Sequence, residues 1–544
     1  MSGPSEEVVY ASGAQAIEDA QIWQRAETGT CTLGQQTLAV GSGLVVLGIL
    51  ILGLRLTFTK PAKGAMSTEA AAALSTAMVP QLIALLSFTL MILESYSLCE
   101  AMDKSAAFSG FLIGLYQLFV PVGNGFLYIL LRRSPRLWKH RPRAILSVSL
   151  LGMIVGALLY MWGCMYAGQS GAQEFFEGGP EAVLMALGAS RVVSGFCAGV
   201  INQLNSVSIL HLAPKEERPE LTTRLYLANM VGIGGGPAMA AAASATLDAL
   251  GVGAARSFGQ AGALQAAAAG AALLAVLARY PVLGGVPDMA EEDTSSKGAE
   301  AVAAAEGGGR ARRKALLITG CLLMTVNRSC VVASLEAATA MLLEEKYFWA
   351  RREIGLMVGL SFLLSIPLKL IHGSLKHRLS VPAWIRLLAG IAAVGSLLFF
   401  PAAGGSAFSL ILADAVLFPS LYLSDGMSVG VLFQNGFPEG SWFDAKTLVL
   451  WQSLLGCGVG RFFGPWSARS TIEGGGQDAY AKQQILLCLV FLFTFEAFVL
   501  PGMQQDGGGG DASPLLEREG YGADADCANE AEASTMLGES GAGR

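Results

Sequence analysis

Long runs of apolar residues alternate with short polar segments along most of the chain. Most of these runs hold about twenty or more residues, and as an α-helix that length crosses the roughly 30 Å hydrocarbon core of a bilayer. The runs do not alternate apolar and polar positions, as the shorter strands of a membrane barrel would. The pattern therefore predicts thirteen transmembrane helices.

One predicted helix stands apart from the others. It covers residues 38–57, and the basic residues Arg55 and Lys60 lie at its end. A cleaved targeting segment is the alternative, but the apolar run is long and lies far from Met1, so we favour a retained signal anchor. The other twelve helices are expected at residues 79–99, 107–131, 144–166, 183–211, 221–246, 260–280, 315–342, 353–373, 383–403, 406–434, 446–467 and 483–502.

A polar segment divides these twelve helices into two sets of six. Residues 281–314 are rich in Gly, Ala and Glu and close with four basic residues, as expected of a linker. We therefore expect one six-helix bundle at residues 79–280, a cytosolic linker at 281–314 and a second bundle at 315–502. The predicted fold class is an all-α membrane protein with a twelve-helix body and one extra N-terminal transmembrane helix.

Composition points to the same class. The chain is 53% hydrophobic and only 14% charged, whereas soluble proteins average about 25% charged residues. Soluble folds, nucleic-acid binders and disulfide scaffolds are therefore excluded. The nine cysteines form no C-x-x-C pair and the four histidines lack ligand spacing, so we expect neither a metal site nor a cofactor. No cluster of catalytic residues is visible, so an enzyme is not expected.

Charge is distributed unevenly along the chain. Residues 1–37 carry a net charge of −4 and residues 503–544 carry −7, and we expect both acidic tails to be disordered. One alternating set of loops and helix ends holds 19 Lys and Arg residues, and the other holds 7. Positively charged loops usually stay in the cytosol. This rule places both ends of the twelve-helix body in the cytosol and residues 1–37 on the far side.

A repeated motif indicates that the two halves are related. The fifth helix contains a G-x-x-x-G-P pattern at residues 232–237, and the eleventh helix repeats it at residues 460–465. Such glycines let a neighbouring helix approach closely, and proline permits a bend. Plain helix packing explains one copy, whereas two copies in equivalent helices favour the repeated halves of secondary transporters. Together with a glycine pair in the fourth helix, the residues expected to pack or gate helices are Gly195, Gly199, Gly232, Gly236, Pro237, Gly460, Gly464 and Pro465.

Three arginines lie inside predicted transmembrane helices. Arg191 is eight residues into the fourth helix, about 12 Å deep. Placing such a charge in the bilayer costs roughly 2.5 to 3.5 kcal/mol, so Arg191 should face a cavity or a carboxylate. Arg328 and Arg461 raise the same requirement near the middle of the seventh and eleventh helices. A side chain that extends to the membrane surface is the structural alternative.

Two carboxylates occupy equivalent helices of the two halves. Glu94 lies in the first helix and Glu336 in the seventh, both near the depth predicted for Arg191. A buried carboxyl group balanced between desolvation and a nearby arginine can gain or lose a proton as access alternates. Arg328 and Glu336 are eight residues apart, about 12 Å along the helix, so each needs a partner from another helix. A structural ion pair is the alternative.

Two aspartates of the tenth helix are weaker candidates. Asp414 and Asp425, together with Pro419, interrupt the apolar run at residues 406–434, and they leave the bounds of this helix poorly defined.

The C-terminal tail contains a short sorting pattern. Asp511, Leu515 and Leu516 fit the acidic dileucine form [DE]-x-x-x-L-[LI], which a sorting adaptor would read as an address to endolysosomes or a vacuole. Patterns this short also occur by chance.

The motifs quoted above resemble those of the major facilitator superfamily over residues 79–502. The run Arg191-x-x-x-Gly195-x-x-x-Gly199 is similar to the family's helix-four arginine motif, and residues 232–237 are similar to its helix-five motif. The loop after the second helix departs from the family's G-x-x-x-D-R-x-G-R-[RK] pattern, because only Arg132 and Arg133 follow its glycines. The resemblance implies a major-facilitator-like body of two six-helix bundles and a coupling role for Arg191.

Further residues resemble one branch of that superfamily, the lysosomal carriers linked to ceroid lipofuscinosis and the vacuolar SPX-type carriers. No SPX domain is expected, because residues 1–78 are too few. This resemblance implies an endolysosomal or vacuolar membrane. It rests on residues 458–465 and on Glu336, Tyr347, Trp349, Glu353 and Gly359.

These patterns together predict a secondary active transporter that moves a small solute by alternating access, with protons as the coupling ion. An arginine-lined anion channel of an endolysosomal membrane is the alternative, and a non-transporting scaffold with partner-recruiting tails is a third hypothesis. The expected partners are the lipid bilayer, the solute or ion, protons and a sorting adaptor, without nucleic acid. The candidate residues for proton coupling or the substrate pathway are Glu94, Arg191, Arg328, Glu336 and Arg461.

Overall fold

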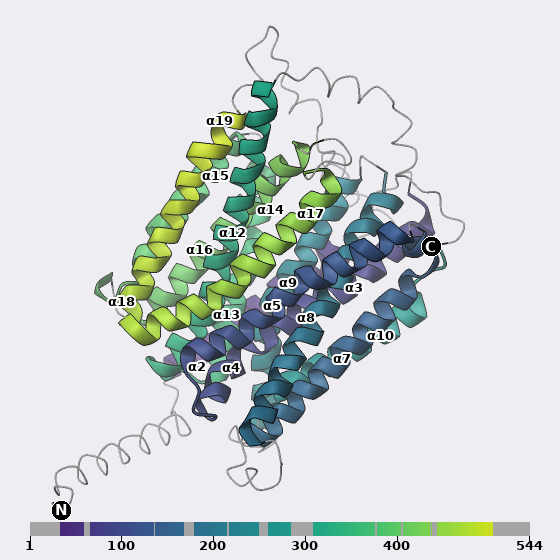
Figure 1. The fold of residues 1–544 in the computed structure, drawn as a ribbon. Coiled ribbons are helices and arrows are strands. Elements are labelled where there is room, and N and C mark those ends of the chain that lie inside the picture. The colour runs from purple at the N-terminus through teal and green to yellow at the C-terminus, as the bar shows by residue number, and fades with distance from the viewer. Residues whose placement is uncertain are drawn as a thin grey trace, which may run out of the picture.

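A computed structural model shows two groups of long helices side by side (Figure 1). No strand occurs in the residues that it describes. Within them, twelve helical stretches are long and apolar enough to cross a membrane. The described residues are 33–58, 66–134, 136–167, 179–214, 217–249, 259–283, 308–375, 378–403, 406–435, 437 and 443–503.

The first group forms the N-terminal bundle. Its first helix begins at Thr68 and not at residue 79, because the Ala-rich turns before residue 79 favour a helix even though they are less apolar. Ser67 caps this helix by accepting a hydrogen bond from the Ala70 N–H at 3.2 Å. The elements are α3 (Thr68–Leu90), α4 (Ile92–Glu100), α5 (Ala106–Arg133), α6 (Leu137–His140), α7 (Pro142–Ala167), α8 (Gly179–Leu212), α9 (Arg218–Ala249) and α10 (Gln260–Arg279).

The second group forms the C-terminal bundle. Its first helix begins at Gly308, inside the segment predicted as a linker, of which residues 284–307 lie outside the described residues. The elements are α12 (Gly308–Glu345), α13 (Arg351–Leu363), α14 (Ser365–Leu375), α15 (Val381–Gly395), η4 (Ser396–Phe399), η5 (Pro401–Ala403), α16 (Ala407–Gln434), α17 (Ala445–Ser453), the π-helix η6 (Leu454–Arg461), α18 (Phe462–Thr494), the π-helix η7 (Phe495–Val499) and α19 (Leu500–Met503).

The tenth predicted helix is continuous. α16 runs without a break through Asp414, Pro419 and Asp425, and its bounds, Ala407–Gln434, agree with the span predicted at residues 406–434. Pro419 lies within the helix, where neighbouring helices tolerate the lost backbone hydrogen bond. Both aspartates are about 1% exposed, which shows that they point into the protein.

The last apolar stretch contains two helices. It runs over 57 residues from Thr447 to Met503, about 85 Å as one helix and too long for a single crossing. Gly476 interrupts it with a φ of 68° and a ψ of −170°, a conformation that glycine readily adopts. Dividing the stretch there gives the thirteen helices that the sequence predicts.

The extra N-terminal helix, α2 (Leu33–Phe58), packs where the two bundles meet. A Cβ atom on its Gly53 would clash with Val231 of α9 and with Ile366 of α14, at 2.6 and 2.8 Å. The predicted span at residues 38–57 therefore exists as a helix and contacts both bundles. The predicted N-terminal tail, residues 1–37, lies almost entirely outside the described residues. Residues 504–544 of the predicted C-terminal tail also lie outside them.

Glycine motifs pack equivalent helices within each bundle. Gly232 and Gly236 of α9 lie against backbone and side-chain atoms of α3, where added Cβ atoms would come within 2.6 and 2.0 Å. Gly460 and Gly464 lie against α12 in the same way, and an added Cβ atom on either glycine would come within 2.6 Å of an atom of α12. The fifth helix thus packs on the first, and the eleventh on the seventh, which matches the predicted internal repeat.

The fourth helix shows a further close approach. Added Cβ atoms on Gly195 and Gly199 of α8 would meet the carbonyl oxygens of Tyr116 and Val120 of α5, at 2.1 and 2.0 Å. The glycines predicted as packing positions therefore do bring neighbouring backbones together.

The same symmetry extends across the interface between the bundles. Gly110 and Gly114 of α5 face the carbonyl oxygens of Pro465 and Phe462, and an added Cβ would come within 2.5 Å of each. On the other side of the molecule, Gly355 and Gly359 of α13 face Pro237 and Gly234 of α9, at 2.6 and 2.9 Å. Backbone therefore meets backbone where the bundles join. These four helices are α5, α9, α13 and α18.

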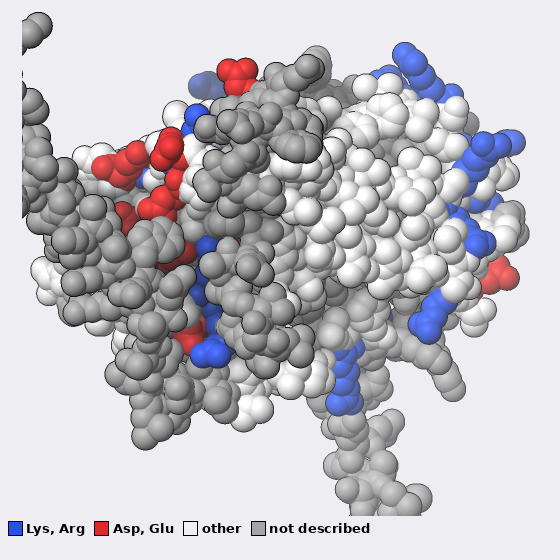
Figure 2. All heavy atoms as spheres, turned by 90° about the horizontal axis from the view of Figure 1, so that it is seen from below, with Lys and Arg blue, Asp and Glu red and all other residues white. Residues whose placement is uncertain are grey.

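The outer surface fits a membrane. Acidic side chains gather toward the left of Figure 2, Lys and Arg stand along the right edge, and a broad uncharged surface lies between them. Large apolar side chains are exposed to the outside, among them Val148 of α7 at 68% and Phe493 of α18 at 66%. Surface of this kind needs lipid around it. We call the end that carries α6 the basic end, and the end with the turn between α4 and α5 the opposite end.

Candidate functional site

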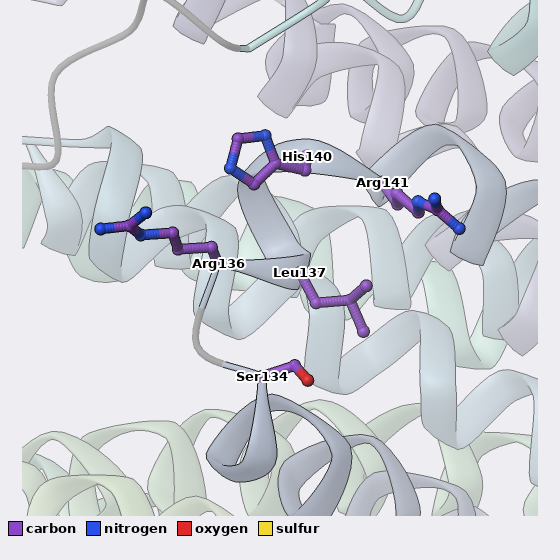
Figure 3. A pocket seen from close by; sticks show the side chains of 5 residues that line it. All are labelled: Ser134, Arg136, Leu137, His140 and Arg141. Carbon is purple, nitrogen blue, oxygen red and sulfur yellow. The ribbon is translucent and has the colours of Figure 1, made fainter.

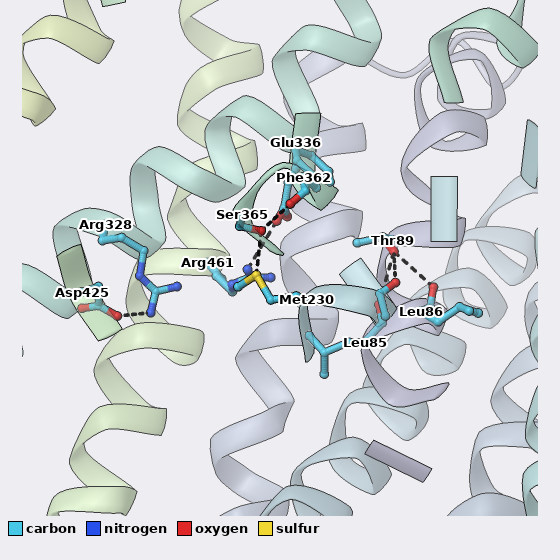
Figure 4. A network of polar contacts seen from close by, with 11 residues as sticks. Leu85, Leu86, Thr89, Met230, Arg328, Glu336, Phe362, Ser365, Asp425 and Arg461 are labelled. Atoms are coloured by element: carbon cyan, nitrogen blue, oxygen red, sulfur yellow. Dashed lines mark hydrogen bonds and ion pairs between the residues drawn. The ribbon is translucent and has the colours of Figure 1, made fainter. Parts of the chain in front are cut away.

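Two arginines of the C-terminal bundle meet two carboxylates in its interior. Arg328 of α12 forms an ion pair with Asp425 of α16 (Figure 4). Thr325 Oγ1 donates a hydrogen bond to the same carboxylate at 2.9 Å. The partner of Arg328 thus comes from another helix, as its spacing from Glu336 requires. Asp425 is this partner, which the sequence analysis did not identify.

The second pair joins the seventh and eleventh helices. Arg461 lies 3.3 Å from a carboxylate oxygen of Glu336, whose side chain is fully buried. Neither oxygen of Glu336 accepts a hydrogen bond in the described structure, and Arg461 Nη1 is also unpartnered. The two charges attract each other without the usual hydrogen bonds, so both carboxylate oxygens can still accept a proton or a hydrogen bond. We call Arg328, Glu336, Asp425 and Arg461 the central cluster.

A π-helix positions Arg461. The segment η6 is a π-helix, a form that is rare and frequently found at functional sites. It ends at Arg461 and contains three glycines, so that the backbone can approach α12 closely before the regular helix resumes. The motif predicted from its glycines and proline therefore also directs the arginine toward Glu336.

Aromatic rings link the central cluster to the N-terminal bundle. Arg461 lies over the ring of Phe88 of α3 at 5.5 Å, and Phe88 lies beside Tyr116 of α5 at 5.5 Å. Arg191 lies over the other ring, Tyr116, at 4.9 Å. Arginine over aromatic faces is a favourable cation–π arrangement. Two buried arginines, one from each bundle, therefore face one aromatic pair between them.

Tyrosines close the cluster on the side of the basic end. Tyr226 of α9 donates a hydrogen bond to the carbonyl oxygen of Tyr422 of α16 at 2.6 Å, and Arg328 lies 5.0 Å from the Tyr422 ring. Asn124 of α5 also donates to Ser453 of α17. These contacts join the two bundles, so the central cluster is enclosed on this side.

Arg469 closes the cluster on the other side. Its guanidinium donates to the Ala337 carbonyl oxygen in its own bundle and to Ser95 and Ser109 of the N-terminal bundle. The predicted helix at residues 446–467 leaves Arg469 in the loop that follows, but α18 continues past it and the side chain is fully buried. The first helix breaker after residue 467 is the glycine run at residues 474–476, and this signal was available in the sequence.

Arg191 has no carboxylate partner among the contacts observed. It donates to the carbonyl oxygens of Leu112 and Phe88 at 3.4 and 3.5 Å and to the sulfur of Met91 at 2.7 Å. Met91 lies at the break between α3 and α4, where backbone carbonyls lose their regular helical partners. Arg191 is 1% exposed, so it does not extend to the membrane surface.

Glu94 lies apart from the central cluster. Its carboxylate accepts hydrogen bonds from the backbone N–H groups of Ala261 and Gly259, at 3.0 and 3.4 Å. These groups begin α10, where unpaired N–H groups and the helix dipole favour a negative charge. The structure therefore brings together Arg328, Glu336 and Arg461, places Arg191 across the aromatic pair and separates Glu94 from them.

The loop at the basic end forms a surface depression of about 410 Å³. Ser134 and Leu137 line it together with Arg136, His140 and Arg141. The two arginines point in different directions (Figure 3), so they do not converge on one ligand. Among the described residues, no group of three or more His, Cys, Asp and Glu side chains could hold a metal ion. The sorting residues Asp511, Leu515 and Leu516 lie outside the described residues.

Solved structures with the same fold are transporters. A D-xylose–proton symporter superposes with a TM-score of 0.57 at 12% identity, covering 78% of this chain and 97% of that one. A POT family transporter in complex with 5-aminolevulinic acid has a TM-score of 0.56 at 11% identity, over 83% and 100%. The inward-open xylose transporter XylE from E. coli has a TM-score of 0.55 at 12% identity, over 78% and 95%. At these identities the likeness shows the fold alone.

The family itself is shown by the sequence. No curated protein matches the chain. A sequence model described as the Major Facilitator Superfamily matches residues 72–465, which include all of the N-terminal bundle beyond the first turn of α3 and most of the C-terminal one. This chain, with its two packed bundles and the buried ion pairs of the second bundle, belongs to the Major Facilitator Superfamily.

Proposed function

We propose that this secondary transporter is coupled to protons and that Glu336 carries the proton. The observation that supports the proposal is the Glu336–Arg461 pair. The pair lies beside the interface between the bundles. The Glu336 side chain is fully buried, and neither of its carboxylate oxygens accepts a hydrogen bond. A carboxyl group in this setting can exist with its charge offset by the arginine or, once protonated, without a charge.

The pair gives a simple coupling step. When a proton binds to Glu336, the carboxyl group becomes neutral and releases Arg461 to bind a polar group of the solute. When the proton leaves, Glu336 attracts Arg461 again and competes with the solute. Proton and solute binding are therefore linked through one guanidinium group, and by thermodynamic linkage each changes the affinity for the other.

The carrier is better supported than an arginine-lined channel. Arg328 and Arg461 are each paired with a carboxylate, and Arg191 lies over an aromatic ring. A ring of arginines that attracts anions needs its charges uncompensated along one pore. The described contacts instead offset two of the three charges.

The proposal includes an orientation and a compartment. The charge of the loops supports a cytosolic position for the basic end, and the residues Asp511, Leu515 and Leu516 support an endolysosomal or vacuolar membrane. Protons would then reach Glu336 from an acidic lumen at the opposite end.

The experiment is a solute screen on vesicles that contain the full-length protein and hold a fixed pH difference. We expect uptake of one solute class to follow the pH gradient and to lose this response in Glu336→Gln. Glu181→Gln is the matched control, because Glu181 is exposed in the first turn of α8. Uptake by the wild type that ignores the gradient would refute proton coupling, and single-channel currents too large for a carrier would select the channel.

A further inference from the structure

A buried carboxylate lies in the C-terminal bundle outside the central cluster. Asp414 of α16 is 1% exposed, and no hydrogen bond reaches either of its carboxylate oxygens. Thr339 of α12 lies within reach of the carboxyl group but forms no hydrogen bond of regular geometry with it, and the Tyr480 hydroxyl group of α18 lies near it without a partner. Enclosing an ionised carboxylate without a counter-charge, beside one such hydroxyl group, costs several kcal/mol. The surroundings therefore suit Asp414 with a bound proton.

The charged groups around α16 have other partners. Tyr480 interacts with Asp414, and Cys488 of α18 and Cys330 of α12 interact with Tyr480. Other charged or titratable groups on the helices packed against α16 contact partners of their own: Arg328 and Glu336 of α12 in the central cluster, Glu344 with Arg351, Arg352 with Glu353, Lys369 over Tyr226, His372 against Trp384, and Arg386 with Glu496. Arg312, Arg313, Lys314 and Glu345 lie at the two ends of α12.

Asp414 lies between the opposite end and the central cluster. At 1.5 Å per residue, Tyr480 is about 6 Å from the break at Gly476, and Asp414 is about 10 Å from the start of α16. Thr339 is about 9 Å from the end of α12 and Glu336 about 13 Å. Glu336 and Thr339 are three residues apart, so their side chains share one face of α12. Tyr480 is thus nearest to the opposite end, Asp414 and Thr339 lie at about the same depth, and Glu336 lies deepest.

The outer side of this sequence is also polar. Gln477 lies one turn before Tyr480 and accepts a hydrogen bond from Lys346 Nζ at 2.7 Å. It donates to the Phe399 carbonyl oxygen at 2.7 Å, and the Phe399 ring packs edge-on against Tyr480. An exposed lysine therefore contacts a buried amide, and one aromatic ring packs between this amide and the Tyr480 hydroxyl group.

We propose that Asp414 is a second proton-binding site, loaded from the opposite end, which passes its proton to Glu336 through the hydroxyl group of Thr339. This inference rests on the proposed function, because Glu336 must accept the proton. The proton on Asp414 moves to Thr339 Oγ1 while the hydroxyl proton of Thr339 moves to the Glu336 carboxylate. Asp414 is left as a carboxylate and takes up the next proton from the opposite end, and Arg461 keeps its charge throughout.

The site can be tested without a solute. Infrared difference spectra of the full-length protein in liposomes, recorded between acidic and alkaline pH, should contain a carboxylic-acid band that is absent in Asp414→Asn. Asp478 is an exposed residue just after the break at Gly476 of α18, so the control variant Asp478→Asn should keep the band. The site is refuted if Asp414→Asn gives the wild-type spectrum, or if its band never changes with pH. Asparagine matches aspartate in shape, so a melting curve suffices to check folding.

The relay through Thr339 has its own test in flux measurements. Thr339→Val should slow gradient-driven uptake at least about tenfold, Thr339→Ser should restore it, and Thr319→Val on the lipid-facing side of the same helix should leave it unchanged. Equal rates in Thr339→Val and the wild type would refute the relay. A wild type that shows the Asp414 band but no gradient-driven uptake would instead refute the proposed function and leave the site intact.

Discussion

The two bundles share one backbone plan and differ in their buried charges. Glycine motifs of α9 and of η6 and α18 pack in the same way on the first helix of each bundle, and each proline carbonyl faces a glycine of the other bundle. In the C-terminal bundle, both buried arginines of the central cluster have carboxylate partners. In the N-terminal bundle, Arg191 contacts carbonyl oxygens, a sulfur and a ring.

This difference separates the motion from the coupling. A symmetric set of backbone contacts can open and close at either end without favouring one bundle, as rocking of repeated halves requires. Proton binding needs a carboxyl group whose charge can be offset or removed, and the described C-terminal bundle provides it at Glu336 and Asp414. We infer that the N-terminal bundle supplies mainly a rigid, positively charged wall.

The largest expected effect comes from removing one arginine of each bundle. Arg461→Gln leaves Glu336 without its counter-charge, so the carboxyl group keeps its proton and uptake no longer responds to the pH gradient. Arg191→Gln removes a charge without a carboxylate partner, so uptake becomes slower while the number of protons moved per solute is kept. Proton and solute fluxes measured together in vesicles check both outcomes. If Arg191→Gln changed the number of protons moved per solute, residues of both bundles would take part in proton coupling.

The Arg328–Asp425 pair should have the next largest effect. Asp425→Asn leaves Arg328 buried without a counter-charge, and the loss of one member of a buried pair costs about 3 to 5 kcal/mol. The double variant Arg328→Met with Asp425→Leu removes both charges and should recover most of this stability. Thermal unfolding in detergent measures both variants. If the single variant were as stable as the wild type, the pair would not hold α12 and α16 together.

The backbone symmetry predicts a smaller and equal effect in both bundles. Alanine at Gly110 or Gly355 would press a methyl group against the carbonyl oxygen of Pro465 or Pro237. Overpacking of this kind costs about 1 to 3 kcal/mol and should open the opposite end. Distances between spin labels at positions 103 and 478 report the opening.

Matched controls exist on the same or the adjoining helix. Gly125→Ala on α5 and Gly373→Ala on α14 meet no atom within 4 Å and should leave the label distances unchanged. An opening in Gly110→Ala but not in Gly355→Ala would show that the two sides of the interface are not equivalent.

The sequence predicts the architecture well because apolar length and glycine spacing are local signals. Thirteen helices, their division into two sets and the repeated G-x-x-x-G-P motif all follow from such signals. The pattern Gly110-x-x-x-Gly114 and its counterpart Gly355-x-x-x-Gly359 had the same form, and they could have been found by comparing the halves.

Partners of buried charges are harder to predict. Arg328 and Asp425 are 97 residues apart, and their contact depends on the rotation of two helices about their axes. Helices that are apolar nearly all round fix this rotation poorly from periodicity. Asp425 is hard to recognise as a partner from the sequence, because charge and proline in one segment resemble the end of a helix. In the structure, Asp425 points inward and contacts Arg328 and Thr325.

The smallest expected effect concerns Glu94, the carboxylate that occupies the first helix as Glu336 occupies the seventh. Its two hydrogen bonds from the start of α10 give it a positioning role, so Glu94→Gln should lower stability by about 1 kcal/mol, the usual contribution of a helix cap. The response of uptake to the pH gradient should remain, in contrast to Glu336→Gln. Unfolding of the two variants under one condition, followed by flux at matched protein levels, separates stability from coupling. If Glu94→Gln lost the pH response while keeping its stability, both halves would carry protons and the asymmetry of the two bundles would be wrong.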